Sequence, residues 1–200
     1  MFPVKHSKTD SAQVALRYRL ELKLLYLCSP LIKAAKPSCL ITLSPREASL
    51  LPEIFKHTGI SVLRLSDSHG RIAFLLYRKS MIAKLIKKPA NILFLRRYGY
   101  RHFFAQSVLS RFAGRYRSYT VGLLPFPHEL GLLLGYPIFD VLGYLKYHGK
   151  YSLMNGYWQV YHKPEAAGRM FRYYDRLRYL AVTEYKCGAT MREICRRRPR

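Results

Sequence analysis

Residues 38–77 read SCLITLSPREASLLPEIFKHTGISVLRLSDSHGRIAFLLY, and they decide the fold because strand and helix signals follow one another closely there. Residues 39–43 are a short apolar run, typical of a buried strand. Ser44-Pro45-Arg46-Glu47 is a capping box with proline at the first helical position, in which the serine hydroxyl and the glutamate carboxylate satisfy free amides. This is the sharpest local signal in the chain.

The helix that begins at this capping box has one apolar face and a defined end. The apolar face is made of Leu50, Leu51, Ile54 and Phe55. Gly59 can adopt the left-handed conformation that ends a helix. Residues 60–66 and 71–77 then predict two strands, and Asp67-Ser68-His69-Gly70 between them has the composition of a hairpin turn. The stretch therefore predicts a strand-helix-strand-strand core.

Helix signals dominate the chain outside this core. Residues 12–27 fit both an alternating and a helical pattern, and we favour a helix; Ser29 followed by Pro30 predicts the start of a second, short helix. Residues 157–161 predict an aromatic strand, which we place as a fourth strand of the sheet. Further helices are predicted over 80–88, 91–98, 102–115, 129–134, 138–147 and after Pro164. We expect one α+β domain over residues 1–200, a small mixed sheet covered by helices, with a helix-rich C-terminal half and flexible basic ends over 1–11 and 190–200.

The composition excludes several classes of protein. Half of the 200 residues are hydrophobic, which is enough apolar surface for a core and excludes intrinsic disorder. Charges interrupt the apolar stretches 20–27 and 121–145, so we expect neither a secretion signal nor a transmembrane helix. The four cysteines form no Cys-x-x-Cys pair and suit a cytoplasmic protein, and we expect no metal site. No phosphate loop or dinucleotide motif is present, so we expect no cofactor.

The net charge of +24 predicts an anionic partner. Residues 68–128 contain no acidic residue, and aromatic residues are interleaved with their cations. Cations that neutralise phosphates beside rings that stack on bases are typical of proteins that bind single-stranded nucleic acid. The predicted anion-binding residues are Lys36, Arg78, Lys79, Lys87, Lys88, Arg96, Arg97 and Arg101. The alternative is that the cations are spread over every solvated surface and the aromatic residues lie in the core.

Residues 128–141, HELGLLLGYPIFDV, have the spacing of a helix-turn-helix. The second helix, however, offers Ile138, Phe139 and Leu142 where a protein that reads base edges needs hydrogen-bond donors. We therefore interpret this segment as a packed helical pair.

Several short motifs in the chain resemble one protein family. They are Phe126-Pro127-His128-Glu129-Leu130-Gly131, Leu134-Gly135-Tyr136-Pro137, Asp140-Val141, Gly156-Tyr157-Trp158-Gln159-Val160-Tyr161, Cys28-Ser29-Pro30 with Lys36, and Tyr77-Arg78. Together they resemble the bacterial family catalogued as domain of unknown function 3793, found mainly in anaerobic Gram-positive bacteria. The likeness spans roughly residues 24–180. It implies a single cytoplasmic domain and no established activity, so it leaves the function open.

The polar residues at the motif positions permit an enzyme as a second hypothesis. Cys28 is the candidate nucleophile and His128 the candidate base. Glu129 or Asp140 would orient the imidazole, and Lys36 or Arg78 would hold an anionic substrate. Structural roles explain the same residues, with Cys28 as a small buried hydrophobe and both carboxylates in the first turns of helices. We predict a cytoplasmic, non-enzymatic protein whose cationic and aromatic surface binds nucleic acid or another polyanion. The alternative is a thiol- and histidine-dependent enzyme acting on a small anionic substrate.

Overall fold

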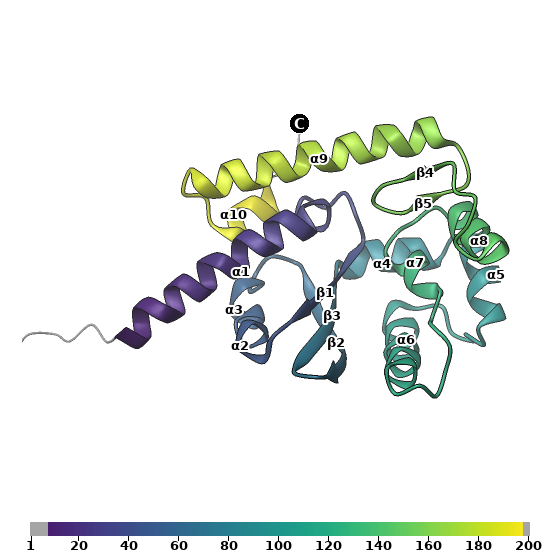
Figure 1. Cartoon of the computed structure of the whole chain (residues 1–200), viewed down its shortest axis with the longest axis horizontal. Helices are drawn as coiled ribbons and strands as arrows, with labels where there is room; N and C mark the ends of the chain where they lie inside the picture. The colour runs from purple at the N-terminus through teal and green to yellow at the C-terminus, as the bar shows by residue number, and fades with distance from the viewer. Residues whose placement is uncertain (1–7, 198–200) are drawn as a thin grey trace, which may run out of the picture.

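A three-stranded sheet with helices packed around it forms the centre of the structure, a computed structural model that describes residues 8–197 (Figure 1). In chain order the elements are α1 (Lys8–Ile32), β1 (Ser38–Leu43), α2 (Pro45–Ala48), α3 (Leu51–Ile54), β2 (Ser61–Ser68), β3 (Arg71–Tyr77), α4 (Lys79–Ile86), α5 (Pro89–Arg97), α6 (Ala105–Thr120), α7 (Glu129–Leu133), α8 (Ile138–Tyr147), β4 (Met154–Asn155), β5 (Gln159–Val160), α9 (Pro164–Lys186) and α10 (Met191–Arg196). The α+β class is therefore confirmed.

The sheet has the strand order β1-β3-β2, and both neighbours of β3 run antiparallel to it. It is thus antiparallel, where we expected a mixed sheet. A tight turn joins β2 to β3, so these two strands must run in opposite directions. Strand β1 pairs with the other edge of β3 and also runs antiparallel to it. His69 and Gly70 form this two-residue turn with φ angles of 51° and 68°, the left-handed values that such hairpin turns require. The predicted hairpin is confirmed.

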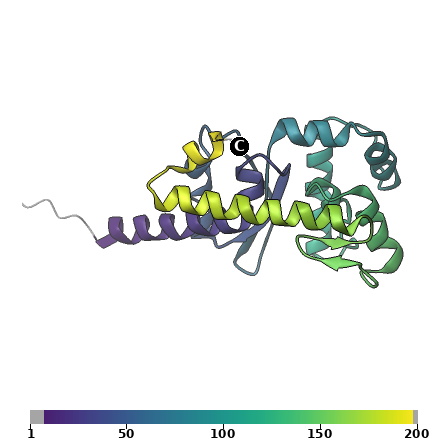
Figure 2. The same cartoon turned by 90° about the horizontal axis from the view of Figure 1, so that it is seen from above.

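Strand β3 is buried on both of its faces. Ile72, Phe74 and Leu76 point to one side, where they pack with α1, α3, α9 and α10, while Ala73 and Leu75 point to the other, among α4 to α8. The two cores therefore lie on opposite faces of one sheet. Figure 2 shows α9 running alongside α1 and continuing beyond it to the β4–β5 hairpin.

The aromatic segment at 157–161 does not join the sheet. Its strand β5 pairs with β4 in a separate hairpin, with Met154 opposite Val160. Trp158 and Val160 are buried against Tyr174 and Leu177 of α9. The prediction of a fourth strand is wrong because these side chains find their apolar partner in a helix.

Ser29 and Pro30 do not start a helix, as we predicted, but lie inside the last turns of α1. The Ser29 hydroxyl donates to the carbonyl of Leu25, one turn earlier, so it does not cap a new helix. Leu31 and Ile32 after the proline are fully buried, and they continue the apolar face of α1. We attribute the continuation to this burial, which outweighs the one amide hydrogen bond that proline removes.

The C-terminal segment is helical where we expected a flexible end. Thr190 and Glu193 form a second capping box at the start of α10, and Met191, Ile194 and Cys195 are buried. The rest of the two expected flexible ends, residues 1–7 and 198–200, lies outside the described residues, and residues 8–11 begin α1. No helix in the described range is long and apolar enough to cross a membrane.

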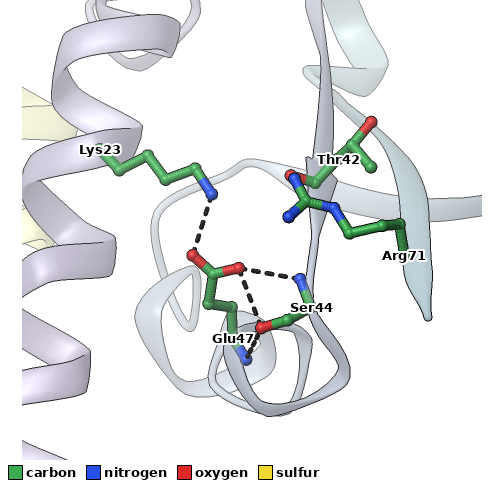
Figure 3. Close-up of polar contacts among 5 residues, drawn as sticks. All are labelled: Lys23, Thr42, Ser44, Glu47 and Arg71. Atoms are coloured by element: carbon green, nitrogen blue, oxygen red, sulfur yellow. Dashed lines mark hydrogen bonds and ion pairs between the residues drawn. The ribbon is translucent and has the colours of Figure 1, made fainter.

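The predicted capping box at Ser44 is present and is tied to α1 (Figure 3). The Ser44 amide donates to Glu47 Oε2 over 2.8 Å, and Lys23 Nζ of α1 lies 2.9 Å from Glu47 Oε1. Partial burial alone raises the pKa of Glu47, but the hydrogen bonds from Ser44 and Lys23 outweigh it and hold the pKa below its usual range. Glu47 thus links α1 to the connection between β1 and α2.

We expect Glu47→Ala to lower the free energy of unfolding by about 1 kcal/mol near neutral pH. Because the folded-state pKa is depressed, the contribution of Glu47 is complete above the unfolded pKa and is lost as the pH falls through the folded pKa. Urea titrations of the variant and the wild type should therefore converge as the pH falls below the folded-state pKa of Glu47. Glu53→Ala, an exposed glutamate in α3, is the control and should change little; an equal effect of both variants contradicts the prediction.

Candidate functional site

The motifs between residues 126 and 161 gather around one pocket between α7, α8 and β5, with a volume of about 290 Å³. Its wall is largely apolar and aromatic, and all its lining residues except Tyr144 come from the family-like motifs: Phe126, His128, Leu130, Gly131, Leu134, Tyr136, Asp140, Val141, Trp158 and Gln159. Segments separated by more than twenty residues thus meet at one place. We call this cavity the motif pocket.

The turn between α7 and α8 shapes the pocket through its glycines. Gly131 faces Val141 so closely that an added Cβ would lie 3.3 Å from that side chain. Gly135 has a φ of +81°, and a Cβ there would lie 2.6 Å from Pro37. Residues 128–141 therefore form a closely packed helical pair, as we interpreted them. This pair packs against Pro37, which lies in the connection between α1 and β1.

Asp140 holds α8 to β5 and carries no free acceptor toward the pocket. Its buried carboxylate accepts hydrogen bonds from Trp158 Nε1 at 2.8 Å and from the amides of Tyr161 and His162 at 2.8 and 2.9 Å. Three donors satisfy the charge, which is what a buried carboxylate needs. The arrangement fixes Trp158 in the pocket wall.

His128 and Glu129, adjacent in sequence, point to different surroundings. The His128 ring lies between Phe126 and Tyr144, with centroids 5.3 and 5.8 Å away, and burial lowers its pKa. Glu129 is fully buried and accepts from the Tyr100 hydroxyl at 3.1 Å and from Arg115. Glu129 therefore balances Arg115 and does not orient the imidazole.

Cys28, the candidate nucleophile, has a thiol as its partner. Its Sγ donates to Sγ of Cys39 in β1 over 3.1 Å, and both thiols lie near the buried amine of Lys36. In the described part of the chain, Cys28 makes no hydrogen bond to His128 or Glu129. The geometry thus brings Cys28 together with Cys39 and Lys36, and Cys39 is a residue that the sequence analysis did not select.

Two of the predicted anion-binding cations are engaged inside the protein. Arg78 donates to the carbonyls of Leu31 and Ile32 at 2.9 and 2.7 Å and so closes the C-terminal end of α1. Lys36 is only 8% exposed, and its Nζ lies 5.0 Å from the centroid of the Tyr136 ring. Arg78 and Lys36 therefore contact groups of the protein itself and are not part of the exposed cationic surface.

The other predicted cations lie on the surface of α4, α5 and the segment before α6. They are Lys79, Lys87, Lys88, Arg96, Arg97 and Arg101, all exposed. Within residues 8–197 none of them forms an ion pair. Arg96 lies 5.6 Å over the ring of Phe103.

Three open hollows follow one another along α6 beside these cations. The first is lined by Arg101 and Arg111, the second by Lys79 and Arg117, and the third by Arg64 and Arg117. Ser110 lines the first two hollows and Arg117 the last two, so neighbouring hollows share a lining residue. We call them together the α6 groove. Of its cations, Arg64, Arg111 and Arg117 were not selected from the sequence, although the last two lie on one helix, about one and two-thirds turns apart.

We expect Asp140→Asn to destabilise the protein by about 3 kcal/mol, because an amide NH₂ would face a donor at a buried site. The chain has a single tryptophan, so fluorescence unfolding curves report on Trp158 directly. Asp175→Asn on the exposed surface of α9 is the matched control and should cost far less. Similar losses for the two variants would show that the buried network contributes no more than a surface carboxylate.

Comparison with known proteins gives one match. No curated protein and no solved structure is similar to the chain. Residues 24–195 match the family described as "Protein of unknown function (DUF3793)", a longer range than the roughly 24–180 of the motif resemblance, because it includes α10. The chain therefore belongs to this family.

Proposed function

We propose that this protein is a cytoplasmic, non-enzymatic binding protein that holds a polyanion, with nucleic acid as the first candidate, in the α6 groove. The observation that carries the proposal is the lack of carboxylates among the groove's cations. Asp67 is the one acidic residue that lines the described groove, and it is paired with Arg64. Lys79, Arg101, Arg111 and Arg117 are exposed and form no ion pair within residues 8–197.

The groove has the shape that an extended polyanion needs. Arg111 and Arg117 are six residues apart on α6, which separates their Cα atoms by about 9 Å along the helix axis. Serine, threonine and glutamine side chains lie between the cations and can donate to phosphate oxygens; they are Gln106, Ser107, Ser110 and Thr120. A chain of anionic groups can therefore follow the helix.

Base stacking contributes less than the sequence pattern indicates. Tyr100 is 3% exposed, and Arg111 lies 5.3 Å over its ring. Phe104, at the start of α6, is 62% exposed, and Tyr119 near its end is 38% exposed. Because the ring of Tyr100 is closed off from solvent, ion release on phosphate contact is the main source of affinity that we propose, with little sequence preference.

A general attraction of a basic protein for anions is the competing explanation, and α9 provides the test. Arg169, Arg172 and Arg176 are exposed on α9. Figure 1 shows α9 on one side of the molecule and α6 on the other. Removing three charges from the α6 groove or three from α9 changes the net charge equally, so only a localised site distinguishes the two variants.

We expect the triple variant Lys79→Gln, Arg101→Gln, Arg117→Gln to reduce the dependence of log K on log salt by about 3, one for each lost phosphate contact. Fluorescence anisotropy with single-stranded and duplex oligonucleotides at several salt concentrations measures this slope. Heparin as competitor distinguishes nucleic acid from polyanions in general.

The matched control is Arg169→Gln, Arg172→Gln, Arg176→Gln, for which we expect a change in slope below about 1. Circular dichroism melting checks that both triple variants fold. Absence of binding at low salt, or an equal loss in both variants, overturns the proposed site.

A further inference from the structure

Two thiols from different elements face each other behind the motif pocket. Cys28 lies in the last turns of α1 and Cys39 near the start of β1, with their sulfur atoms 3.1 Å apart. Both positions are fixed by the fold, because Cys28 is buried in the core beside Leu24 and Leu31, and Cys39 is paired with Leu76 of β3. A disulfide bond is about 2.05 Å long, so the two sulfur atoms need to approach by only about 1 Å.

A buried ammonium group lies beside this pair. Lys36 is 8% exposed, and in the described chain no carboxylate forms an ion pair with it. An unpaired charge is costly to bury, and burial lowers the pKa of Lys36. The groups near its amine are the two thiols and the ring of Tyr136. A thiolate in the pair is therefore the anion that the structure offers to Lys36.

The two thiols are not equivalent. The hydrogen bond from Cys28 lowers the pKa of Cys39 against the opposing effect of burial, and Lys36 adds to the lowering. The same hydrogen bond and burial raise the pKa of Cys28. Cys39 is half-buried and Cys28 fully buried. Cys39 is thus the thiol that ionises first and that a reagent in solution reaches first.

We infer that Cys28 and Cys39 form a redox-active dithiol that reduces a disulfide-bearing molecule and closes to an intramolecular disulfide. The Cys39 thiolate attacks one sulfur of the external disulfide, whose S–S bond breaks and releases one thiolate, leaving a mixed disulfide on Cys39. Cys28 then gives its proton to the released thiolate, and its sulfur attacks the sulfur of Cys39. The bond between Cys39 and the bound group breaks, and that group leaves as a thiolate, which takes up the proton that Cys39 lost on ionising. The protein loses two electrons to the external disulfide, which becomes two thiols. This activity is independent of the α6 groove.

The remaining cysteines serve as internal references. Cys187 is exposed, and Cys195 is buried with its pKa raised to about 11 by that burial. In residues 8–197 neither forms a hydrogen bond to another thiol. Cys187 therefore reports the reactivity of an ordinary surface thiol, which can only be capped by an external reagent.

The test uses the full chain and glutathione disulfide as the probe. After incubation in glutathione buffers of increasing oxidation, the protein is unfolded in guanidinium with N-ethylmaleimide, digested and analysed by mass spectrometry. We expect peptides containing Cys28 and Cys39 as a linked pair that lacks two hydrogens and carries no maleimide, and we expect dithiothreitol to reverse it. Maleimide on both Cys28 and Cys39 in buffers that glutathionylate Cys187 overturns the inference.

Variants assign the separate steps. Cys28→Ser should stop the reaction at a glutathione adduct on Cys39, because the second thiol that resolves it is missing.

Lys36→Met should slow alkylation of Cys39 near neutral pH by roughly threefold to tenfold and shift the pH profile of that alkylation upward. Lys23→Met removes a lysine of α1 that is paired with Glu47 and is the matched control, with no expected shift. Superimposable profiles for the wild type and Lys36→Met contradict the role of Lys36 as the group that positions and stabilises the thiolate.

Discussion

The burial of β3 on both faces is the constraint on which the structure depends. Five consecutive residues, Ile72 to Leu76, are each no more than 7% exposed, so helices must cover both sides of a sheet of only three strands. The chain supplies α1, α3, α9 and α10 for one side and α4 to α8 for the other. The dithiol lies at the sheet edge where α1 meets β1, and the α6 groove lies on the opposite side, because α6 packs across β2. Strand β3 therefore lies between the dithiol on the side of β1 and the α6 groove on the side of β2.

The scarcity of carboxylates explains how the cations are distributed. The chain has 11 acidic residues, and several of those described are used at joints between elements. Glu184 lies 2.7 Å from the buried amine of Lys33 and joins α9 to α1, and Glu129 balances Arg115 inside the second core. Asp140 holds three donors around the motif pocket. Carboxylates committed to buried contacts cannot neutralise exposed cations, so the exposed lysines and arginines of α4 to α6 form no ion pair within residues 8–197.

The sequence predicts local features better than it predicts contacts. The capping box at Ser44 and the hairpin at Gly70 depend on neighbouring residues alone, and both are present. The capping box at Thr190 is equally visible in the sequence. The arginines that follow it predict a flexible end, however, and the buried face of α10 is therefore not predicted. The pairing of Cys28 with Cys39 had no local signal, because it requires α1 to continue through Pro30 and the chain to reverse before β1. Burial against the core decided that continuation, and no dipeptide pattern encodes it.

Burial also separates lysines and arginines that the sequence treats alike. Lys36, Arg78 and Lys33 are near the end of α1 or face it, and each is held by groups of the protein itself, a ring, backbone carbonyls or a carboxylate. Desolvation makes an unmatched charge there costly, so these cations are tuned to fixed internal partners and have little capacity for a mobile ligand. The exposed cations of α4 to α6 are hydrated and form no ion pair in the described chain, and hydrated charges release ions when a polyanion binds. Lysines and arginines therefore have two roles in this protein. The buried ones hold internal contacts near α1, and the exposed ones of α4 to α6 attract anions from solution; the burial of the side chain determines the role.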